Sequence, residues 1–297
     1  MATPLSPDRM VAALKAEGVR VVQVGNWRTH NRNSRGAWGP VNGSIVHHTV
    51  TRGTASTVAL VRNGHSTLPG PLCHGMIAKD GTVHMVGWGR TNHAGGGDPK
   101  VLQHVINEDY TGQLHPTRGN SNGVDGNAHY YGWECENLGN GQDPWPAAQY
   151  DAIVRVQAAL CRAHGWSAKS VIGHLEWSSD KVDPRGFAMT TLRADVAERL
   201  KHPAGWNPSG STTPTTPDTQ EDDMQLNDQV GIGDWMPRRW PDDKGLKDKK
   251  ISVETALGSA YGHSRVAHEG VDALRKEVAA VTAQLAEVLA LLKQGRA

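Results

Sequence analysis

The sequence has few of the features that mark disulfide-rich or membrane proteins. Only three cysteines, Cys73, Cys135 and Cys161, occur in 297 residues, and each lies within an apolar run. Their odd number and wide separation exclude the disulfide framework of small secreted domains, so we expect three buried free thiols. No stretch reaches the ~20 apolar residues of a membrane-spanning helix, so no membrane insertion is expected.

No excess of charge of either sign is present. The chain has 31 basic and 30 acidic residues, a net charge of +1, and its Lys and Arg are scattered. A nucleic-acid-binding protein usually shows a basic patch, so we expect no nucleic-acid partner. The first residues also lack the basic start and apolar core of a secretory signal, which predicts a soluble product made in the cytoplasm.

Phenylalanine is nearly absent, whereas tryptophan is abundant. The sequence has one Phe, 5 Tyr and 10 Trp. Trp and Tyr combine an apolar ring with a polar group, which suits binding grooves as well as cores. We expect most of these rings to lie in the core and Trp88 to line a groove.

Local signals alternate between helix and strand over the first 200 residues. Ser6, Pro7 and Asp8 supply a cap, a proline and an acid for a helix that should end at Gly18. Further helices are expected at 54–63, 147–164 and 190–201, and strands at 19–24, 44–49, 76–78, 82–86, around 134 and at 171–172. This order predicts an α/β fold with a central mixed sheet flanked by helices, and a functional site at the strand ends.

The composition changes after residue 205. Residues 208–217 are rich in Pro, Thr and Ser, which is typical of an extended linker. We therefore predict a first domain over 1–205, a linker over 206–223 and a small helical module over 224–297.

An apolar repeat runs through the end of this C-terminal module. Its positions are Val271, Leu274, Val278, Val281, Leu285, Val288 and Leu292. Spacings of three and four are typical of a coiled coil, although a helix that packs on its own domain gives the same pattern. Few other apolar residues remain to cover the stripe, which favours a homo-oligomer formed through this helix.

Met224 raises a separate hypothesis. The acidic residues directly before it have purine-rich codons that resemble a ribosome-binding site, so an internal start would yield the C-terminal module alone. The simpler interpretation is that an acidic stretch precedes this methionine by chance.

Two imidazoles and a carboxylate form the main candidate site. The pair His47 and His48 lies far upstream of His174 and Asp183, and Lys181 precedes Asp183 by two residues. Two His and one carboxylate are a ligand set of catalytic zinc, which keeps a fourth position open for water. In an extended segment Lys181 would lie on the same side as Asp183, where a cation neutralises a developing oxyanion.

Spacing alone does not establish this site. With 15 histidines, His-His and Gly-His pairs also arise by chance. If residues 44–49 form a strand, His47 and His48 point to opposite faces, and the residues alone do not decide which one faces the site.

Five segments occur in an order that carries more information than any one of them. They are residues 44–49, 80–83, 92–95, 132–137 and 173–184. Together they resemble the zinc-dependent N-acetylmuramoyl-L-alanine amidases, the family of phage endolysins, phage lysozyme-amidases and peptidoglycan recognition proteins, over about residues 20–200. The resemblance implies that residues 1–205 are a catalytic domain with this family's fold and with Zn2+ as cofactor.

The resemblance assigns the metal ligands. It implies that His47, His174 and Asp183 bind zinc, because the first His of the pair corresponds to the family's ligand. His48 then packs or caps.

The resemblance also assigns catalytic roles. Glu134 corresponds to the general base, with Glu136 on the same strand face as the fallback and a salt-bridged strand-end glutamate as the structural alternative. In the reaction of this family, we expect Lys181 to hold the oxyanion together with zinc and His93 to contact the substrate or the intermediate. Where some relatives carry a tyrosine, this chain has Cys73, so an acid or base hydroxyl is absent there.

The resemblance implies a hydrolase that cleaves the amide between N-acetylmuramic acid and L-alanine of bacterial peptidoglycan with a zinc-activated water. Without a secretory signal, we expect a bacteriolytic phage endolysin that leaves the host cytoplasm through a separate pore. The alternative is a non-catalytic peptidoglycan recognition protein, and a third interpretation is a structural role for the tail. The complete ligand set favours the enzyme. Whether the C-terminal module binds the wall or only assembles chains stays open.

Overall fold

The computed structural model describes residues 2–207, 229–231 and 250–252. The chain divides into two units, Met1–Thr212 and Thr213–Ala297. Most of the predicted linker, the apolar repeat and Met224 lie outside the described residues. The domain boundaries at 205 and 223, the coiled coil and the internal start therefore stay predictions.

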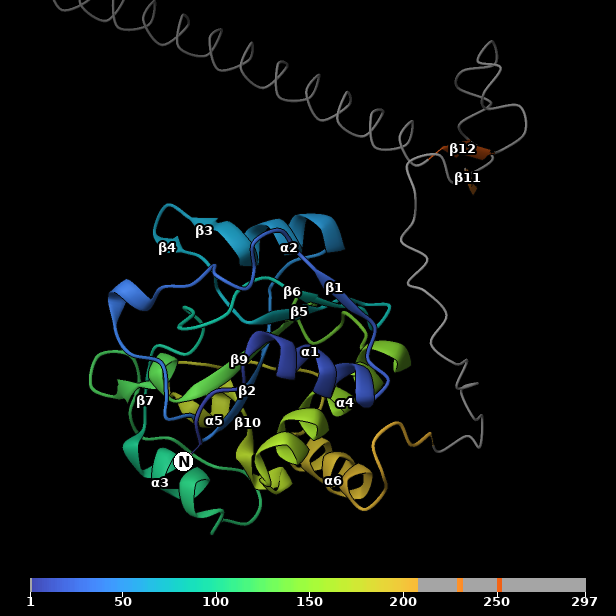
Figure 1. The fold of residues 1–297 in the computed structure, drawn as a ribbon. Coiled ribbons are helices and arrows are strands. Elements are labelled where there is room, and N and C mark those ends of the chain that lie inside the picture. Colours follow the sequence, from blue (N-terminus) through green and yellow to red (C-terminus); the bar gives the residue numbers. More distant parts are fainter. Residues whose placement is uncertain (1, 208–228, 232–249, 253–297) are drawn as a thin grey trace, which may run out of the picture. The chain divides into compact units, whose positions relative to one another are not determined.

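A six-stranded mixed sheet forms the centre of the first unit (Figure 1). In spatial order its strands are β1 (Val21–Gln23), β6 (Val83–Met85), β5 (Gly75–Ile77), β9 (Tyr130–Cys135), β2 (Gly43–His48) and β10 (Val171–Gly173). Every neighbouring pair is parallel except β5 and β6, which form an antiparallel hairpin. The predicted central mixed sheet is confirmed.

The strands β2 and β9 are interior neighbours in the sheet and form its longest pairing. They pair in register from Gly43 opposite Tyr130 to His48 opposite Cys135. Because they are parallel, their carboxyl ends lie at the same edge, and His47 is the register partner of Glu134.

Helices cover both faces of the sheet. Val46 packs in a core cluster with residues of α1 (Pro7–Ala16), α4 (Ala147–His164) and α6 (Met189–Leu200). Its neighbour Ile45 points to the opposite face and packs with residues of α3 (Pro99–Asn107) and α5 (His174–Trp177). His47 and Glu134 have the same strand parity as Ile45 and Tyr130, so the site forms on the face that α3 and α5 cover.

Several elements match the sequence prediction closely. The helix α4 spans the predicted residues and ends at Gly165, whose φ of 70° is the left-handed cap that favours glycine. The Ser6 hydroxyl accepts a hydrogen bond from the Arg9 amide and caps α1, as expected. The helix α2 (Thr54–Asn63) also has its predicted bounds.

Other elements were not predicted. The helix α3 begins after the Asp98 cap, and the ribbons β3 (Gly64–His65) with β4 (Leu68–Pro69) and β7 (Gly96–Gly97) with β8 (Val124–Asp125) are new. Short 3-10 helices lie at Asn33–Arg35, Gly126–Ala128 and Ala168–Ser170.

The prediction that Trp88 lines a groove is wrong. Its side chain is 5% exposed and packs edge-on against Trp27 and Trp38, while its ring N–H donates to the Leu5 carbonyl. The ring is therefore part of the core.

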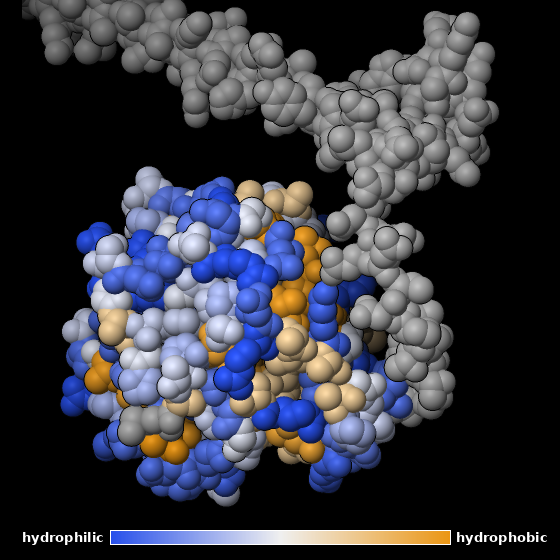
Figure 2. Space-filling model, in the orientation of Figure 1, coloured by the Kyte–Doolittle hydropathy of each residue, from blue (hydrophilic) through white to orange (hydrophobic). Residues whose placement is uncertain are grey.

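The three cysteines are buried and free, as expected. Among the described residues no helix combines the length and the apolar character needed to cross a bilayer. The face shown in Figure 2 is largely polar, with apolar residues gathered over β1, where Val22 is 43% exposed.

In the second unit, β11 (Gln229–Gly231) and β12 (Lys250–Ser252) form an antiparallel pair. The predicted helical module did not include these strands.

Candidate active site

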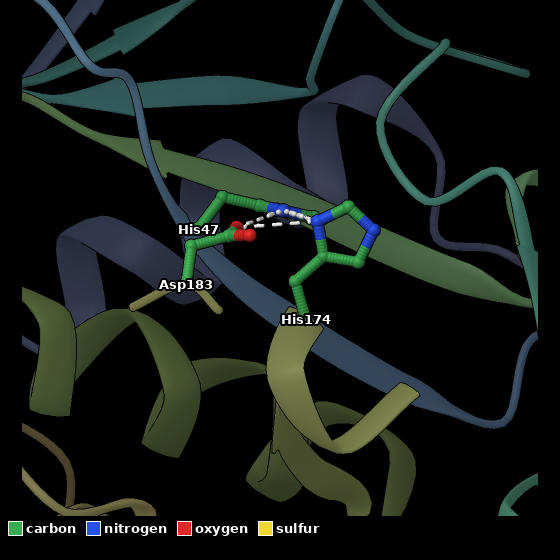
Figure 3. Close-up of side chains that lie close together, drawn as sticks. All are labelled: His47, His174 and Asp183. Carbon is green, nitrogen blue, oxygen red and sulfur yellow. Dashed lines mark hydrogen bonds and ion pairs between the residues drawn. The ribbon is translucent and has the colours of Figure 1, made fainter. Parts of the chain in front are cut away.

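Three donor atoms from separate segments meet at the carboxyl ends of β2 and β10 (Figure 3). His47 Nδ1 lies 2.9 Å from His174 Nδ1, and Asp183 Oδ2 lies 3.1 Å from each of these nitrogens. Among the described residues these side chains form the group of His, Cys and acidic residues that could hold a metal ion.

The sheet explains why residues so distant in sequence converge. Gly173 on β10 pairs with Val46 on β2, so His174, the first residue of α5, follows beside His47. A side-chain carbon on Gly173 would lie 3.0 Å from both Pro184 and Met189. The absence of a side chain here lets the segment that carries Asp183 approach β10 closely.

The protonation states of these groups suit a metal. Burial and the nearby His174 lower the pKa of His47 to about 4, so its imidazole is neutral at pH 7. Burial alone would raise the pKa of the Asp183 carboxyl, but its hydrogen bonds with His174 and His47 hold that pKa well below its usual range. The cluster therefore presents a neutral His47 imidazole and an ionised Asp183 carboxylate.

The remaining ring nitrogens have their own partners. His174 Nε2 lies 3.1 Å from the Ala94 carbonyl and must donate to it, while its Nδ1 faces Asp183 Oδ2. His47 Nε2 lies 3.1 Å from His93 Nδ1. A cation bound between the three atoms would take the place of the protons shared with Asp183 Oδ2, and each ring would then carry its proton on Nε2. Three electron-rich atoms at this separation fit a cation between them, and their identity fits catalytic zinc.

Glu134 is half-buried beside His47 of the donor set, and its Oε2 atom is buried. Burial and the charge of Asp183 raise its pKa to about 8, and the Lys181 ammonium opposes this shift. Its Oε2 has no hydrogen-bond partner among the described residues. This oxygen is free to accept a proton or to donate one.

The fallback Glu136 is occupied by a structural role. Its Oε1 accepts from the Gly53 amide at 2.7 Å and its Oε2 accepts from the Thr54 hydroxyl at 2.8 Å. Both contacts hold the start of α2, which leaves Glu134 as the carboxyl available for chemistry.

His48 lies outside the donor set. Its Nδ1 accepts from the Arg185 amide at 3.2 Å, and a side-chain carbon on Gly139 would lie 2.3 Å from its Nε2. The ring packs under the loop beside the site, so the structure brings His47 rather than His48 to Asp183 and His174.

His93 lies beside His47 and also lines the cavity over the donor set. Its side chain is 7% exposed and lies against Gly132, where a side-chain carbon would come within 2.3 Å of the ring. Because its Nδ1 is engaged with His47, the geometry favours an action through His47, and the substrate contact stays a prediction.

A cavity of about 360 Å³ opens over these groups. Its floor includes His47, His174, Asp183, Glu134 and Lys181, and its walls include Leu60 and Val61 of α2 and His65 and Leu68 of the β3–β4 ribbon. Lys181 thus faces the same space as Asp183, as expected.

Three exposed apolar residues lie at the rim of this cavity, beside the exposed polar residues His65 and Asp180. Val50, Leu68 and Val182 line it and are 67%, 40% and 53% exposed. Val50 also has a φ of 54°, which a β-branched residue rarely adopts. Exposed apolar side chains at a cavity mouth point to a substrate with apolar groups.

Residues 37–186 match the family described as N-acetylmuramoyl-L-alanine amidase. The chain belongs to this family. The matched region contains the donor set, Glu134, Lys181 and His93. No curated protein matches the chain.

Solved structures of amidases are also similar to this chain. The catalytic domain of XlyA is 18% identical with a TM-score of 0.40, over 60% of this chain and 99% of that chain. A mutant endolysin from Bacillus subtilis is 20% identical with a TM-score of 0.38, over 60% and 99%. The amidase LysC from Clostridium intestinale URNW is 18% identical with a TM-score of 0.39, over 60% and 97%.

The amidase site of this chain departs from the pattern at Cys73. The thiol is fully buried, and burial together with the neighbouring Glu134 raises its pKa well above the usual range. A thiol that stays protonated is a poor acid or base, which leaves Glu134 and Lys181 as the catalytic candidates.

Two amidase residues that support the site were not found from the sequence. Ala94 lies within residues 92–95, one of the five segments recognised in the sequence. That segment did not show that the Ala94 carbonyl accepts a hydrogen bond from His174. Asn127 bonds the same segment, and no pattern in the sequence identified it.

Proposed function

We propose that this protein is a zinc-dependent amidase that cleaves the bond between N-acetylmuramic acid and L-alanine in bacterial peptidoglycan. The observation that carries the proposal is the convergence of two imidazole nitrogens and a carboxylate oxygen beside Glu134, whose buried Oε2 has no hydrogen-bond partner among the described residues. Membership of the amidase family supports the choice of bond.

His47 Nδ1, His174 Nδ1 and Asp183 Oδ2 would hold the zinc ion. When bound, zinc supplies Lewis acidity that lowers the pKa of a water and polarises the carbonyl to be attacked. Burial keeps the His47 imidazole neutral and thereby keeps its lone pair available.

Glu134 is the general base of this proposal. Its Oε2 accepts the proton of the attacking water and later delivers that proton to the leaving amine of alanine. A pKa raised to about 8 suits this exchange, because the carboxyl both gains and loses a proton near neutral pH.

Lys181 provides positive charge on the cavity floor. Its ammonium offsets the negative charge that develops on the carbonyl oxygen as the bond to water forms. The exposed apolar residues Val50, Leu68 and Val182 at the rim would contact the methyl groups of the lactyl and alanyl units.

We further propose that the protein acts as a phage endolysin, reaching the wall from the host cytoplasm, with chains associated through the C-terminal helix. The Pro/Thr-rich linker and the apolar repeat support a separate tail that adds avidity. The complete donor set with Glu134 supports catalysis over the alternative of non-catalytic recognition.

One experiment separates these functions. The full chain is dialysed, its bound metals are quantified, and purified peptidoglycan is digested and assayed for new L-alanine amino termini. We expect about one zinc per chain and new amino termini that disappear after chelation. Wall binding without new amino termini would identify a recognition protein instead.

A further inference from the structure

Two consecutive residues supply the hydrogen-bond partners of both imidazoles of the donor set on the side away from Asp183. His93 Nδ1 lies 3.1 Å from His47 Nε2, and the Ala94 carbonyl lies 3.1 Å from His174 Nε2. The Ala94 carbonyl can only accept, so it places a proton on His174 Nε2, while His93 Nδ1 shares one proton with His47 Nε2. The segment His93–Ala94 also fixes the orientation of both rings.

A single side chain fixes this segment. Asn127 Oδ1 accepts from the His93 amide at 2.8 Å and from the Ala94 amide at 2.9 Å. Asn127 is 6% exposed and lies in the short helix Gly126–Ala128. The Asn127 amide donates to the Asp125 carboxylate at 3.1 Å, which anchors the acceptor itself.

Close backbone contacts restrict the segment further. A side-chain carbon at Gly126 would lie 2.7 Å from Ala94, and one at Gly132 would lie 2.3 Å from the His93 ring. The Gly126 amide also donates to the Gly95 carbonyl at 2.8 Å. His93 and Ala94 are therefore held between two glycines, with the orientation of their backbone set by Asn127.

We infer that Asn127 is a positioning residue for zinc binding, acting on both histidine ligands through His93 and Ala94. The inference rests on the proposed zinc site and adds a residue that touches neither metal nor substrate. Groups that hydrogen-bond to metal-binding imidazoles fix their tautomer and direction, and losing them typically weakens metal affinity by about 10–100-fold. Loss of the Asn127 oxygen would release the hydrogen-bond partners of both rings together.

The test compares Asn127→Leu with Asn127→Asp in the full chain. Leucine removes the acceptor at similar size, whereas aspartate keeps an oxygen at the same place. We expect Asn127→Leu to raise the zinc dissociation constant in chelator competition by about 10–100-fold. Aspartate should restore most of this loss, and the visible spectrum of cobalt-substituted protein should change in the leucine variant.

Gln149→Leu is the matched control. Gln149 is a fully buried amide on α4 whose Nε2 donates to the carbonyls of Ile77 and Glu136, and it bonds no member of the donor set. We expect it to lower the melting temperature of the metal-free protein without changing zinc affinity or the cobalt spectrum.

His93→Phe gives an independent measurement should Asn127→Leu fail to fold. The phenyl ring keeps the volume over Gly132 but removes the hydrogen-bond partner of His47, so zinc affinity should fall. Unchanged zinc affinity with a raised KM would assign His93 to substrate binding and overturn the inference.

The two proposals fail in different ways. A wild-type protein that binds no zinc overturns both of them. A wild type that binds zinc, together with a folded Asn127→Leu variant of equal affinity and equal cobalt spectrum, overturns the role of Asn127 alone.

Discussion

His47 and Glu134 are register partners on the parallel strands β2 and β9. A proposed metal ligand and a proposed general base are thus adjacent by virtue of sheet pairing, although they lie 87 positions apart in the sequence. A one-residue slip in this pairing would turn one of the two side chains to the opposite face.

The donor set makes a sharp prediction about metal binding. Replacement of His47, His174 or Asp183 by Ala should each abolish stoichiometric zinc binding and activity, because three ligands leave no redundancy. His48→Ala should keep its metal, since His48 bonds the Arg185 amide instead. Metal content after dialysis gives the answer, and zinc retained in His47→Ala but lost in His48→Ala would reverse the assignment.

The catalytic roles predict variants that bind zinc but react slowly. Glu134→Gln and Lys181→Met should keep zinc while the rate falls by about 10²–10⁴-fold. Glu136→Gln is the control, because it weakens the start of α2 and should lower the melting temperature more than the rate. Release of L-alanine amino termini measures the rate. If Glu136→Gln proved the slower enzyme, the general base would move two residues along the chain.

The raised pKa of Glu134 predicts a pH dependence of stability in chelator-treated protein. The folded state keeps the Glu134 proton up to about pH 8, whereas the unfolded chain releases it near its ordinary value of 4.5. Between these values the folded state binds more protons, so this group lowers the free energy of unfolding as pH rises, by up to about 1.4 kcal/mol per pH unit. Its stabilising contribution is complete below 4.5 and is lost as pH rises through 8.

Glu134→Gln lacks this titration. Its stability relative to wild type should therefore increase from about pH 5 to about pH 8 in urea unfolding. A difference that stays constant over this range would show that the Glu134 carboxyl has an ordinary pKa.

The donor set also predicts that zinc stabilises the fold. Its ligands come from segments that only the folded sheet brings together, so zinc binds the native state. At a free zinc concentration 100-fold above the dissociation constant, the gain is about 2.7 kcal/mol. Melting temperature measured against zinc concentration should rise steadily, and a flat dependence in a protein that binds zinc would contradict this linkage. Asp183→Ala serves as the control that should not respond.

Apolar spacing and capping residues predicted the helices whose bounds depend on the residues nearest in sequence. The helix α4 was predicted with its bounds because its apolar spacing and Gly165 determine its course. The helix α3 was missed although Asp98 and Pro99 mark its start and Val101, Leu102 and Val105 its buried face. Trp88 was misplaced because abundance of an aromatic residue does not show which rings the core takes.

The site was predictable only in part. The order of the motifs pointed to His47, His174 and Asp183, which the structure brings together, whereas alternation along a strand could not choose between His47 and His48. Asn127 could not be found, because its contacts with His93 and Ala94 depend on how the chain returns after more than 30 residues. Hydrogen bonds of this kind follow from tertiary approach and leave no periodic pattern.

At Val50, the stability of the fold and the binding of substrate place opposite demands on one residue. A left-handed backbone costs a non-glycine residue about 1–2 kcal/mol, and the exposed Val50 accepts this strain at the rim of the cavity. Val50→Asn should therefore raise the melting temperature and also raise KM, while the same change at Val22 on β1 should only destabilise. Selection of this protein for heat resistance alone would therefore be expected to replace residues at the cavity rim, with loss of substrate affinity, before residues of the core.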